Sequence, residues 1–211
     1  MNVAIVDYGL GNLFSVKHAC EHVGIPAEIT SDKKKILNAN GVILPGVGAF
    51  GDAMQSLRKL DLVSVLKELA SADKPFMGIC LGLQLLMEES HEFGLHRGLG
   101  ILKGNVIRFD SPREGRRALK VPQIGWNQIH SSHPWTETPL SGLKEGEFMY
   151  FVHSYVVQPD DRGVILSQSN YGSVEFCSSI HRGRLFACQF HPEKSGPAGL
   201  KIYENFFKRD R

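Results

Sequence analysis

The stretch that decides the fold is Lys74-Pro75-Phe76-Met77-Gly78-Ile79-Cys80-Leu81-Gly82-Leu83-Gln84-Leu85-Leu86-Met87. It opens with a short apolar run that predicts a buried strand, turns at residues 78–82, and continues with apolar residues at helical spacing. Two glycines flank Cys80 in a G-x-C-x-G pattern, the strand–turn–helix arrangement that presents a nucleophile, here with cysteine in place of serine. The stretch therefore predicts an α/β fold that presents the Cys80 thiol at the edge of the sheet, at the end of a strand.

The glycines on either side of Cys80 have a steric reason. A nucleophile in such a turn has a strained backbone, so side chains at positions 78 and 82 would collide with the neighbouring strand and helix. The turn also places the sulfur over the first turn of the helix, whose free N–H groups favour a thiolate. The competing interpretation is a buried structural cysteine between unrelated glycines, and the strand–turn–helix context favours the nucleophile.

The N-terminal half of the chain alternates strand and helix patterns. Strands are predicted at residues 3–6, 27–30 and 41–44, and helices at about 13–23, 52–60 and 62–70. This alternation predicts parallel βαβ units with right-handed crossovers. Functional groups in such a sheet gather at the carboxyl ends of the strands, where residues 45–48 and Cys80 both lie.

The second half of the chain has a different pattern. Between about residues 98 and 189, turn residues separate short strand-like runs: 105–109, 124–129, 148–151, 155–157, 164–169 and 174–180. These predict antiparallel or mixed strands that extend the parallel core of an open sheet. Residues 111–117 are expected to form an exposed loop, residues 185–190 the last strand, and residues 199–207 a closing helix. No repeat or linker divides the chain, so residues 1–211 are predicted to form a single domain.

The composition excludes several classes of protein. The 211 residues are 42% hydrophobic and 22% charged, as in a soluble globular protein. A net charge of +2 gives no reason to expect nucleic acid or a membrane surface as partner. The chain start lacks the features of a signal peptide and no apolar run approaches the ~20 residues of a membrane span, so a cytoplasmic location is expected.

Metal and cofactor sites are not predicted. The four cysteines, Cys20, Cys80, Cys177 and Cys188, lack metal-ligand spacing, and in a cytoplasmic chain they are expected to be reduced thiols. All but Cys80 are expected to be core residues. The loop with Gly9 and Gly11 lacks the rest of a dinucleotide fingerprint. We therefore expect no metal and no cofactor.

A histidine and a glutamate follow the last predicted strand. His191 and Glu193 stand two positions apart, so on an extended strand their side chains share a face, and Pro192 between them ends the ladder. A cysteine nucleophile needs an imidazole, and the imidazole needs a partner that fixes its tautomer. Cys80, His191 and Glu193 supply all three, whereas the competing interpretation of residues 191–193 is a surface turn.

Acyl transfer at Cys80 also requires donors for an oxyanion. The backbone N–H of Leu81 is the first after the nucleophile. The second candidate is an N–H of the segment Pro45-Gly46-Val47-Gly48, for which we expect Val47. The alternative is that residues 45–48 form a simple turn after a strand.

Together these motifs resemble those of a known family, the class I or triad glutamine amidotransferases. The resemblance is carried by residues 78–84, by residues 45–48 and by Gln189-Phe190-His191-Pro192-Glu193. More narrowly, four motifs are similar to those of the glutaminase subunits of imidazole glycerol phosphate synthases: residues 7–13, residues 45–50, Gly125-Trp126-Asn127 and residues 150–155. The resemblance covers nearly the whole chain.

The resemblance implies a flavodoxin-like, three-layer fold and a glutaminase activity. L-glutamine would be hydrolysed to glutamate and ammonia through a thioester on Cys80, with His191 passing protons and Glu193 orienting it. The ammonia would pass to a separate (β/α)8-barrel synthase subunit in a heterodimer that makes imidazole glycerol phosphate and AICAR in histidine biosynthesis. Two glycines in residues 45–48 would let a peptide rotate there, so the free subunit is expected to be nearly silent until the partner binds.

Further site residues follow from the resemblance. Gln84 and Glu92 match positions that hold the substrate, and the backbone near Ser154 and Tyr155 suits its α-carboxylate. Their alternatives are a solvent-facing helix residue for Gln84 and a solvated charge for Glu92. Four residues match positions that face the synthase and the ammonia exit, with ordinary surface or packing residues as the alternative: Asn12, Trp126, Tyr150 and Lys194.

Three other functions remain open at this point. Gln123 and Ile124 stand where many family members have His-Met, on a face expected to meet the partner, so a partner that amidinates a bacterial surface sugar is the first alternative. A cysteine hydrolase of the α/β-hydrolase type is disfavoured because its acid normally precedes the histidine. A degenerate binding subunit is disfavoured because the three predicted catalytic residues are present.

Overall fold

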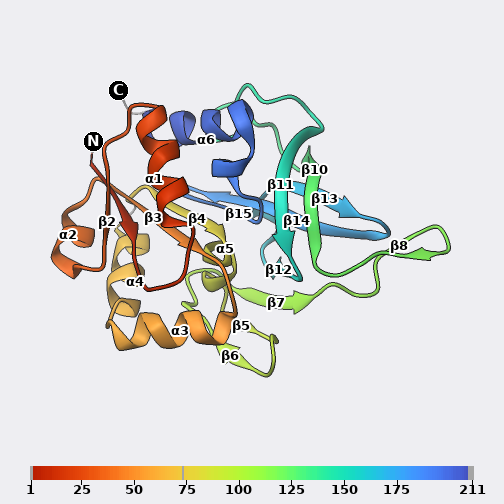
Figure 1. The fold of residues 1–211 in the computed structure, drawn as a ribbon, viewed down its shortest axis with the longest axis horizontal. Coiled ribbons are helices and arrows are strands. Elements are labelled where there is room, and N and C mark those ends of the chain that lie inside the picture. The colour runs from red at the N-terminus through yellow and green to blue at the C-terminus, as the bar shows by residue number, and fades with distance from the viewer. Residues whose placement is uncertain (1, 73, 209–211) are drawn as a thin grey trace.

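The computed structural model describes residues 2–72 and 74–208, and the described chain is organised around a nine-stranded mixed sheet (Figure 1). The strand order across this sheet is β11-β10-β13-β14-β15-β4-β3-β1-β2. The strand bounds are β1 Val3–Val6, β2 Ala27–Thr30, β3 Gly41–Gly46, β4 Phe76–Cys80, β10 Gln123–Ser131, β11 Glu147–His153, β13 Ile165–Tyr171, β14 Val174–Arg182 and β15 Leu185–Cys188.

Five neighbouring strands, from β2 to β15, run parallel, and helices cover both faces of this half (Figure 1). Alternate residues of β1 face opposite sides because side chains alternate along a strand. Ala4 and Val6 join the core under α3 and α4, whereas Val3 and Ile5 join the core under α1 and α6. The helices are α1 Leu13–His22, α2 Lys33–Asn38, α3 Phe50–Lys59, α4 Val63–Ser71 and α6 Gly196–Lys208.

The rest of the chain extends the sheet and adds a smaller one. Strands β14, β13, β10 and β11 continue the main sheet with antiparallel pairing. A four-stranded sheet of order β12-β7-β5-β6 lies beside it, and β8 and β9 form a projecting hairpin (Figure 1). The remaining bounds are α5 Leu81–Leu85, β5 Glu89–Ser90, β6 His96–Arg97, β7 Gly104–Arg108, β8 Arg113–Glu114, β9 Arg117–Ala118, β12 Tyr155–Pro159 and the 3₁₀ turns η1 Arg162–Val164 and η2 Pro192–Lys194.

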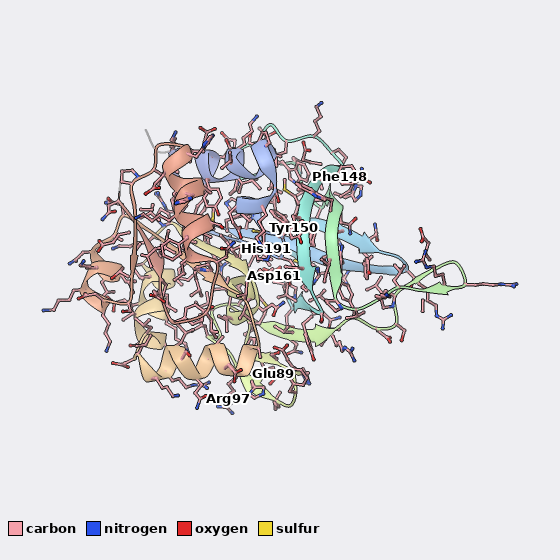
Figure 2. All side chains as sticks on the ribbon, viewed as in Figure 1. Glu89, Arg97, Phe148, Tyr150, Asp161 and His191 are labelled. Carbon is pink, nitrogen blue, oxygen red and sulfur yellow. The ribbon has the colours of Figure 1, made fainter. Side chains whose placement is uncertain are left out.

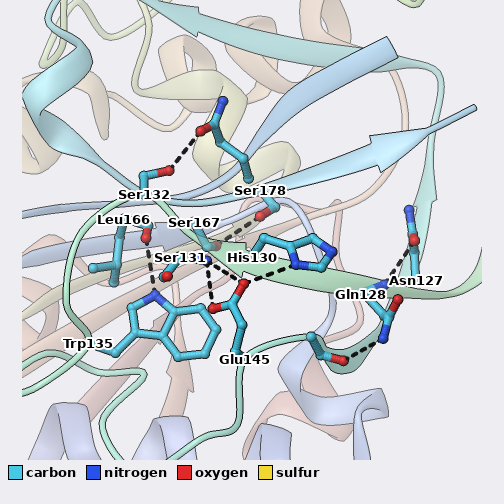
Figure 3. Close-up of polar contacts among 12 residues, drawn as sticks. Asn127, Gln128, His130, Ser131, Ser132, Trp135, Glu145, Leu166, Ser167 and Ser178 are labelled. Atoms are coloured by element: carbon cyan, nitrogen blue, oxygen red, sulfur yellow. Dashed lines mark hydrogen bonds and ion pairs between the residues drawn. The ribbon is translucent and has the colours of Figure 1, made fainter. Parts of the chain in front are cut away.

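Side chains fill the spaces between the sheets and the helices (Figure 2). Polar side chains hold the segment between β10 and β11 against the antiparallel strands (Figure 3). The Glu145 carboxylate accepts from the backbone N–H of Ser131 at 3.1 Å and lies 3.0 Å from Nδ1 of His130. The indole N–H of Trp135 donates to the carbonyl of Leu166 at 3.2 Å. These contacts fix the end of β10 and the segment that leads into β11, whose last residues, Val152 and His153, line the cavity described below.

The predicted fold class, an open sheet with a parallel core and antiparallel extension, is confirmed, and several boundaries differ. The third strand runs on to Gly46, and the last strand ends at Cys188. The closing helix begins at Gly196 because Pro197 lies in its first turn, where a backbone N–H is not needed. Residues 111–117, predicted to be a loop, contain strand β8 of the exposed hairpin.

Candidate active site

The turn between β4 and α5 has the strained geometry that its sequence predicts. Cys80 has φ 54° and ψ −107°, in a backbone region that residues other than glycine rarely adopt. A Cβ at Gly78 would lie 2.9 Å from the Cβ of Ala187, and a Cβ at Gly82 would overlap the carbonyl oxygen of Leu44. The steric prediction for both glycines is therefore confirmed, and the turn holds the Cys80 backbone between two strands and a helix.

His191 and Glu193 form a buried pair. Nδ1 of His191 lies 2.8 Å from Oε1 of Glu193, and their side chains are 2% and 1% exposed. The backbone N–H of His191 donates to the carbonyl of Tyr150 at 2.9 Å, which ties the pair to β11, and Figure 2 shows Tyr150 and His191 side by side. The hydroxyl of Ser195 donates to the carbonyl of His191 at 2.7 Å. These bonds fix the imidazole from the backbone as well as from its carboxylate partner.

The prediction that His191 and Glu193 share the face of a strand is wrong in detail. The strand ends at Cys188, and the 3₁₀ turn η2 carries Glu193 back toward the imidazole. Pro192 has no N–H to continue a ladder, and its fixed φ suits the first position of a helical turn. The same two side chains therefore meet, through a turn rather than through strand alternation.

The nucleophile and the imidazole come from neighbouring strands. β15 pairs in parallel with β4, with Cys188 beside Ile79, so the residues after both strands lie on one rim. Nε2 of His191 is buried and makes no hydrogen bond of standard geometry among the described residues, and it interacts with Cys80. Burial lowers the pKa of His191, but the Cys80 sulfur and the Glu193 carboxylate outweigh it and raise that pKa to about 10. The His191 ring is therefore an imidazolium near neutral pH, next to the Cys80 sulfur.

A cavity of about 320 Å³ opens beside Cys80. Six predicted oxyanion and substrate residues line it together with Cys80: Val47, Leu81, Gln84, Glu92, Ser154 and Tyr155. The carboxylate of Glu92 accepts from the backbone N–H of Phe50, the first residue of α3, at 2.6 Å. A cavity of this size with a few polar groups on its wall is typical of a small-molecule site.

Two glutamines behind the nucleophile are linked to each other. The amide of Gln84 donates to the side-chain oxygen of Gln189 at 3.1 Å and to the carbonyl of Tyr155 at 3.2 Å. The amide of Gln189 in turn lies 3.6 Å from the Cys80 sulfur as a donor. Sequence reasoning placed Gln84 at the substrate and assigned Gln189 no role of its own. In the structure Gln84 supports the cavity wall and Gln189 contacts the thiol.

The segment after β3 packs against the elbow. A Cβ at Gly46 would lie 2.9 Å from Cβ of Leu81 and would overlap the hydroxyl of Tyr8, which donates to the carbonyl of Pro45 at 2.8 Å. Gly48 follows with φ 102°, in the left-handed region. The packing of Gly46 on Leu81 therefore places Val47 in the lining of the cavity, together with Leu81, the residue that follows the nucleophile.

His153 is a second buried histidine of the cavity wall. Its Nδ1 lies 2.9 Å from the carbonyl of Tyr155, and its Nε2 lies 3.1 Å from the side-chain oxygen of Gln123. The pKa of His153 is lowered to about 4, mainly by burial. The hydrogen bond to the Tyr155 carbonyl raises this pKa, and the charge of His191 lowers it further. The expectation that position 123 faces a partner is wrong, because Gln123 is buried against His153, whereas Ile124 beside it is 64% exposed.

The residues predicted to face a partner lie outside this cavity. Trp126 is 56% exposed and packs edge-to-face on Tyr150, with ring centroids 6.0 Å apart. Nζ of Lys194 lies 5.7 Å from the centroid of the Tyr150 ring. Phe148 and Ile124 on the same two strands are also more than half exposed. Asn12 precedes α1, whose Phe14 is 73% exposed.

The other three cysteines are buried free thiols, which confirms their interpretation as core residues: Cys20, Cys177 and Cys188. Burial raises the pKa of Cys20 and of Cys177 to about 12, so both thiols stay protonated. Within residues 2–72 and 74–208, no cluster of three or more His, Cys, Asp or Glu side chains is arranged to bind a metal ion. In that same part of the chain, no helix combines the length and the apolar character that a membrane crossing requires.

Known proteins match this chain over nearly its full length. The family model described as glutamine amidotransferase class-I matches residues 4–209. "Imidazole glycerol phosphate synthase subunit HisH" of Aquifex aeolicus is 50% identical over 99% of this chain and 97% of its own, and the HisH subunit of Rhodopirellula baltica is 47% identical over 97% and 96%.

Solved structures show the same fold at low sequence identity. A structure of PurLQS from Thermotoga maritima superposes with a TM-score of 0.75 at 20% identity, over 100% of this chain and 99% of that one. A glutamine amidotransferase from the same organism gives 0.64 at 15% identity, over 100% of this chain and 83% of that one. At these identities the superpositions support the fold alone.

Proposed function

Since this chain belongs to the class-I glutamine amidotransferase family, we propose that it hydrolyses L-glutamine to glutamate and ammonia as the glutaminase subunit of an imidazole glycerol phosphate synthase. The observation that carries the proposal is the strained Cys80 elbow beside a buried His191–Glu193 pair, at the mouth of a 320 Å³ cavity. The HisH relatives, which are 44–50% identical, support the assignment of the synthase.

The reaction proceeds in two acyl-transfer steps. The Cys80 thiolate attacks the side-chain amide carbon of glutamine, and the imidazolium of His191 gives a proton to the leaving ammonia. His191 then takes a proton from water, which attacks the thioester and releases glutamate and the thiolate. Glu193 holds Nδ1 of the imidazole throughout and stabilises its cationic form. The N–H groups of Leu81 and Val47 stabilise the oxyanion of each tetrahedral intermediate.

The cavity recognises the two charged ends of the substrate backbone. The Glu92 carboxylate binds the α-ammonium group, since the backbone N–H of Phe50 at the start of α3 holds one of its oxygens and so fixes the carboxylate in the cavity wall. The backbone at Ser154 and Tyr155 binds the α-carboxylate. Gln84 fixes the Tyr155 carbonyl and so keeps this part of the wall in place.

The partner is a (β/α)8-barrel synthase subunit in a heterodimer. The partner docks on the exposed face of β10 and β11, where Trp126, Ile124 and Phe148 offer apolar area. On the same face, the ammonium group of Lys194 lies over the ring of Tyr150. Ammonia leaves Cys80 along this side, with Asn12 at its edge, and is used there to make imidazole glycerol phosphate and AICAR in histidine biosynthesis. The (β/α)8 partner and the exit route follow from the family resemblance.

Residues 1–211 act as a single glutamine amidotransferase domain, which the two hydrophobic clusters on opposite faces of one sheet support. A cytoplasmic location is supported by four free cysteines, which suit a reducing compartment. Partner binding turns on the activity by rotating the peptide between Gly46 and Val47, so that Val47 presents its N–H to the oxyanion.

The test is glutamate release by the chain alone, with the barrel protein of an imidazole glycerol phosphate synthase, and with that barrel protein plus its substrate analogue. We expect little turnover alone and at least ~10²-fold stimulation in the full complex, the size of one oxyanion donor. Cys80→Ser should abolish glutamate release while the complex still uses free ammonia. Equal turnover in all three mixtures would contradict the loop switch, and stimulation only by a sugar-amidinating synthase would assign the other pathway.

A further inference from the structure

Only one of the two carboxylate oxygens of Glu193 has an assigned partner. Oε1 accepts from Nδ1 of His191, whereas Oε2 is buried without a hydrogen bond from any described residue. The side chain is 1% exposed, so bulk water does not reach it. A buried ionised carboxylate needs donors on both oxygens, because an unpaired charged oxygen in the interior is strongly unfavourable.

A second unpaired polar atom lies on the helix that follows. The hydroxyl of Tyr203, on α6, is fully buried and has no hydrogen-bond partner among the described residues. Helix α6 packs directly on η2, the turn that carries Glu193. Burial raises the pKa of Tyr203 well above its ordinary range, and the charge of Glu193 is the next cause. The hydroxyl is therefore a permanent donor in the field of that carboxylate.

The other ionisable groups near this hydroxyl are neutral and therefore do not offer it an anionic acceptor. Cys20 of α1 and Cys188 of β15 are the remaining ionisable groups that act on Tyr203. Burial raises the pKa of Cys20 to about 12 and that of Cys188 well above its ordinary value, so both are neutral. Strand β11, which also packs on α6, contributes apolar side chains to this core: Met149 and Phe151. Glu193 is thus the anionic acceptor of this cluster.

We propose that Tyr203 is a positioning residue of the triad, whose hydroxyl donates through one buried water molecule to Oε2 of Glu193. The inference rests on the proposed function of Cys80, His191 and Glu193. A water molecule between the two unpaired atoms accepts from the tyrosine and donates to the carboxylate, which is how buried water commonly satisfies such groups. The relay then has four side chains: Cys80, His191, Glu193 and Tyr203.

The role predicts a change in protonation rather than in substrate binding. Tyr203→Phe removes the donor and keeps the ring. Without that donor the carboxylate stabilises the His191 imidazolium less, so the pKa of His191 falls and the imidazolium supports a thiolate at Cys80 less strongly, which moves the thiolate to higher pH. Alkylation of Cys80 requires the thiolate, so it should need a higher pH in this variant.

The decisive experiment is alkylation of Cys80 by iodoacetamide as a function of pH, followed by mass spectrometry of the Cys80 peptide. We expect the midpoint for Tyr203→Phe to lie about half to one pH unit above that of the wild type. Tyr171→Phe is the matched control, since its hydroxyl donates to the carbonyl of Lys120 at 2.7 Å, away from the triad. Its midpoint should equal that of the wild type.

A second readout separates positioning from a structural role. In the complex with the synthase, Tyr203→Phe should lower kcat about 3- to 10-fold and leave KM for glutamine unchanged, with no fall in Tm. Superimposable alkylation profiles would overturn the inference, as would a lower Tm with an unshifted profile. Because alkylation needs no glutamine, an inactive wild-type complex would contradict the proposed function while the profile still decides the role of Tyr203.

Discussion

The buried His153 should make the folded state sensitive to mild acid. Its ring is neutral in the folded chain because burial lowers its pKa from 6.5 to about 4. The folded-state pKa therefore lies below the unfolded value, so the unfolded chain binds more protons between these two pH values. Stability from the neutral ring is fully present above about pH 6.5 and is lost as the pH falls toward about 4.

The size of the effect follows from the two pKa values. A shift of one unit corresponds to about 1.4 kcal/mol, so complete protonation of His153 destabilises the fold by about 3 kcal/mol. At pH 5 His153 is protonated in most unfolded molecules and neutral in most folded ones, so the free energy of unfolding is about 2 kcal/mol lower than at neutral pH. For a domain with a total stability of roughly 5–15 kcal/mol this loss is large.

The perturbation is His153→Gln, which keeps a polar side chain beside Tyr155 and Gln123 but does not titrate. Unfolding by urea at pH 7.5 and at pH 5.0 gives the free energy of unfolding at each pH. We expect the wild type to lose about 2 kcal/mol more than this variant between the two conditions. His133→Gln, at an exposed position, is the control and should behave like the wild type. Equal losses in wild type and His153→Gln would refute the reasoning, because the ring would then not be held neutral.

Three further predictions concern the triad, the elbow and the docking surface. Glu193→Gln should lower kcat for glutamine by about 10²-fold or more with little change in KM, because the amide does not stabilise an imidazolium; steady-state kinetics of the complex test this, and an unchanged kcat would contradict it. Gly82→Ala should destabilise the fold by several kcal/mol, since its Cβ would overlap the Leu44 carbonyl. Gly100→Ala has open space and should cost only about 1 kcal/mol, for its φ of 61°. Thermal melts should show a clearly lower Tm for Gly82→Ala than for Gly100→Ala. Trp126→Ala should weaken synthase binding by about 2 kcal/mol or more without changing Tm, and calorimetric titration giving the wild-type affinity would remove Trp126 from the interface.

The parallel half of the fold was predictable because each strand is buried on both faces. Strands such as Val3–Val6 and Phe76–Cys80 are continuous apolar runs, and glycines mark the turn after the second of them. The rim argument also brought Cys80 and His191 together, because both follow strands of one parallel sheet. These predictions needed only local sequence and the general geometry of βαβ units.

The other parts of the site depend on pairing that local sequence does not contain. His153 is buried because β10 and β11 pair in the register that places Gln123 opposite it. Gln189 contacts the thiol because it follows β15 beside β4. Both residues are polar and isolated in the sequence, and only strand order and register show that they point inward. The link from Tyr203 to Glu193 depends likewise on how α6 packs on η2.

The parallel pairing of β4 with β15 has a consequence for how the protein folds. It joins Phe76 to Leu185, with the antiparallel pairs β10–β11 and β13–β14 and the smaller sheet between them in the chain. Closing so long a loop carries a large entropic cost, so contacts of this kind form late, after local hairpins and helices. The nucleophile therefore gains its imidazole only when the whole chain has condensed. A nascent or partly folded chain therefore lacks the contact between Cys80 and His191, and folding itself controls when the triad is assembled.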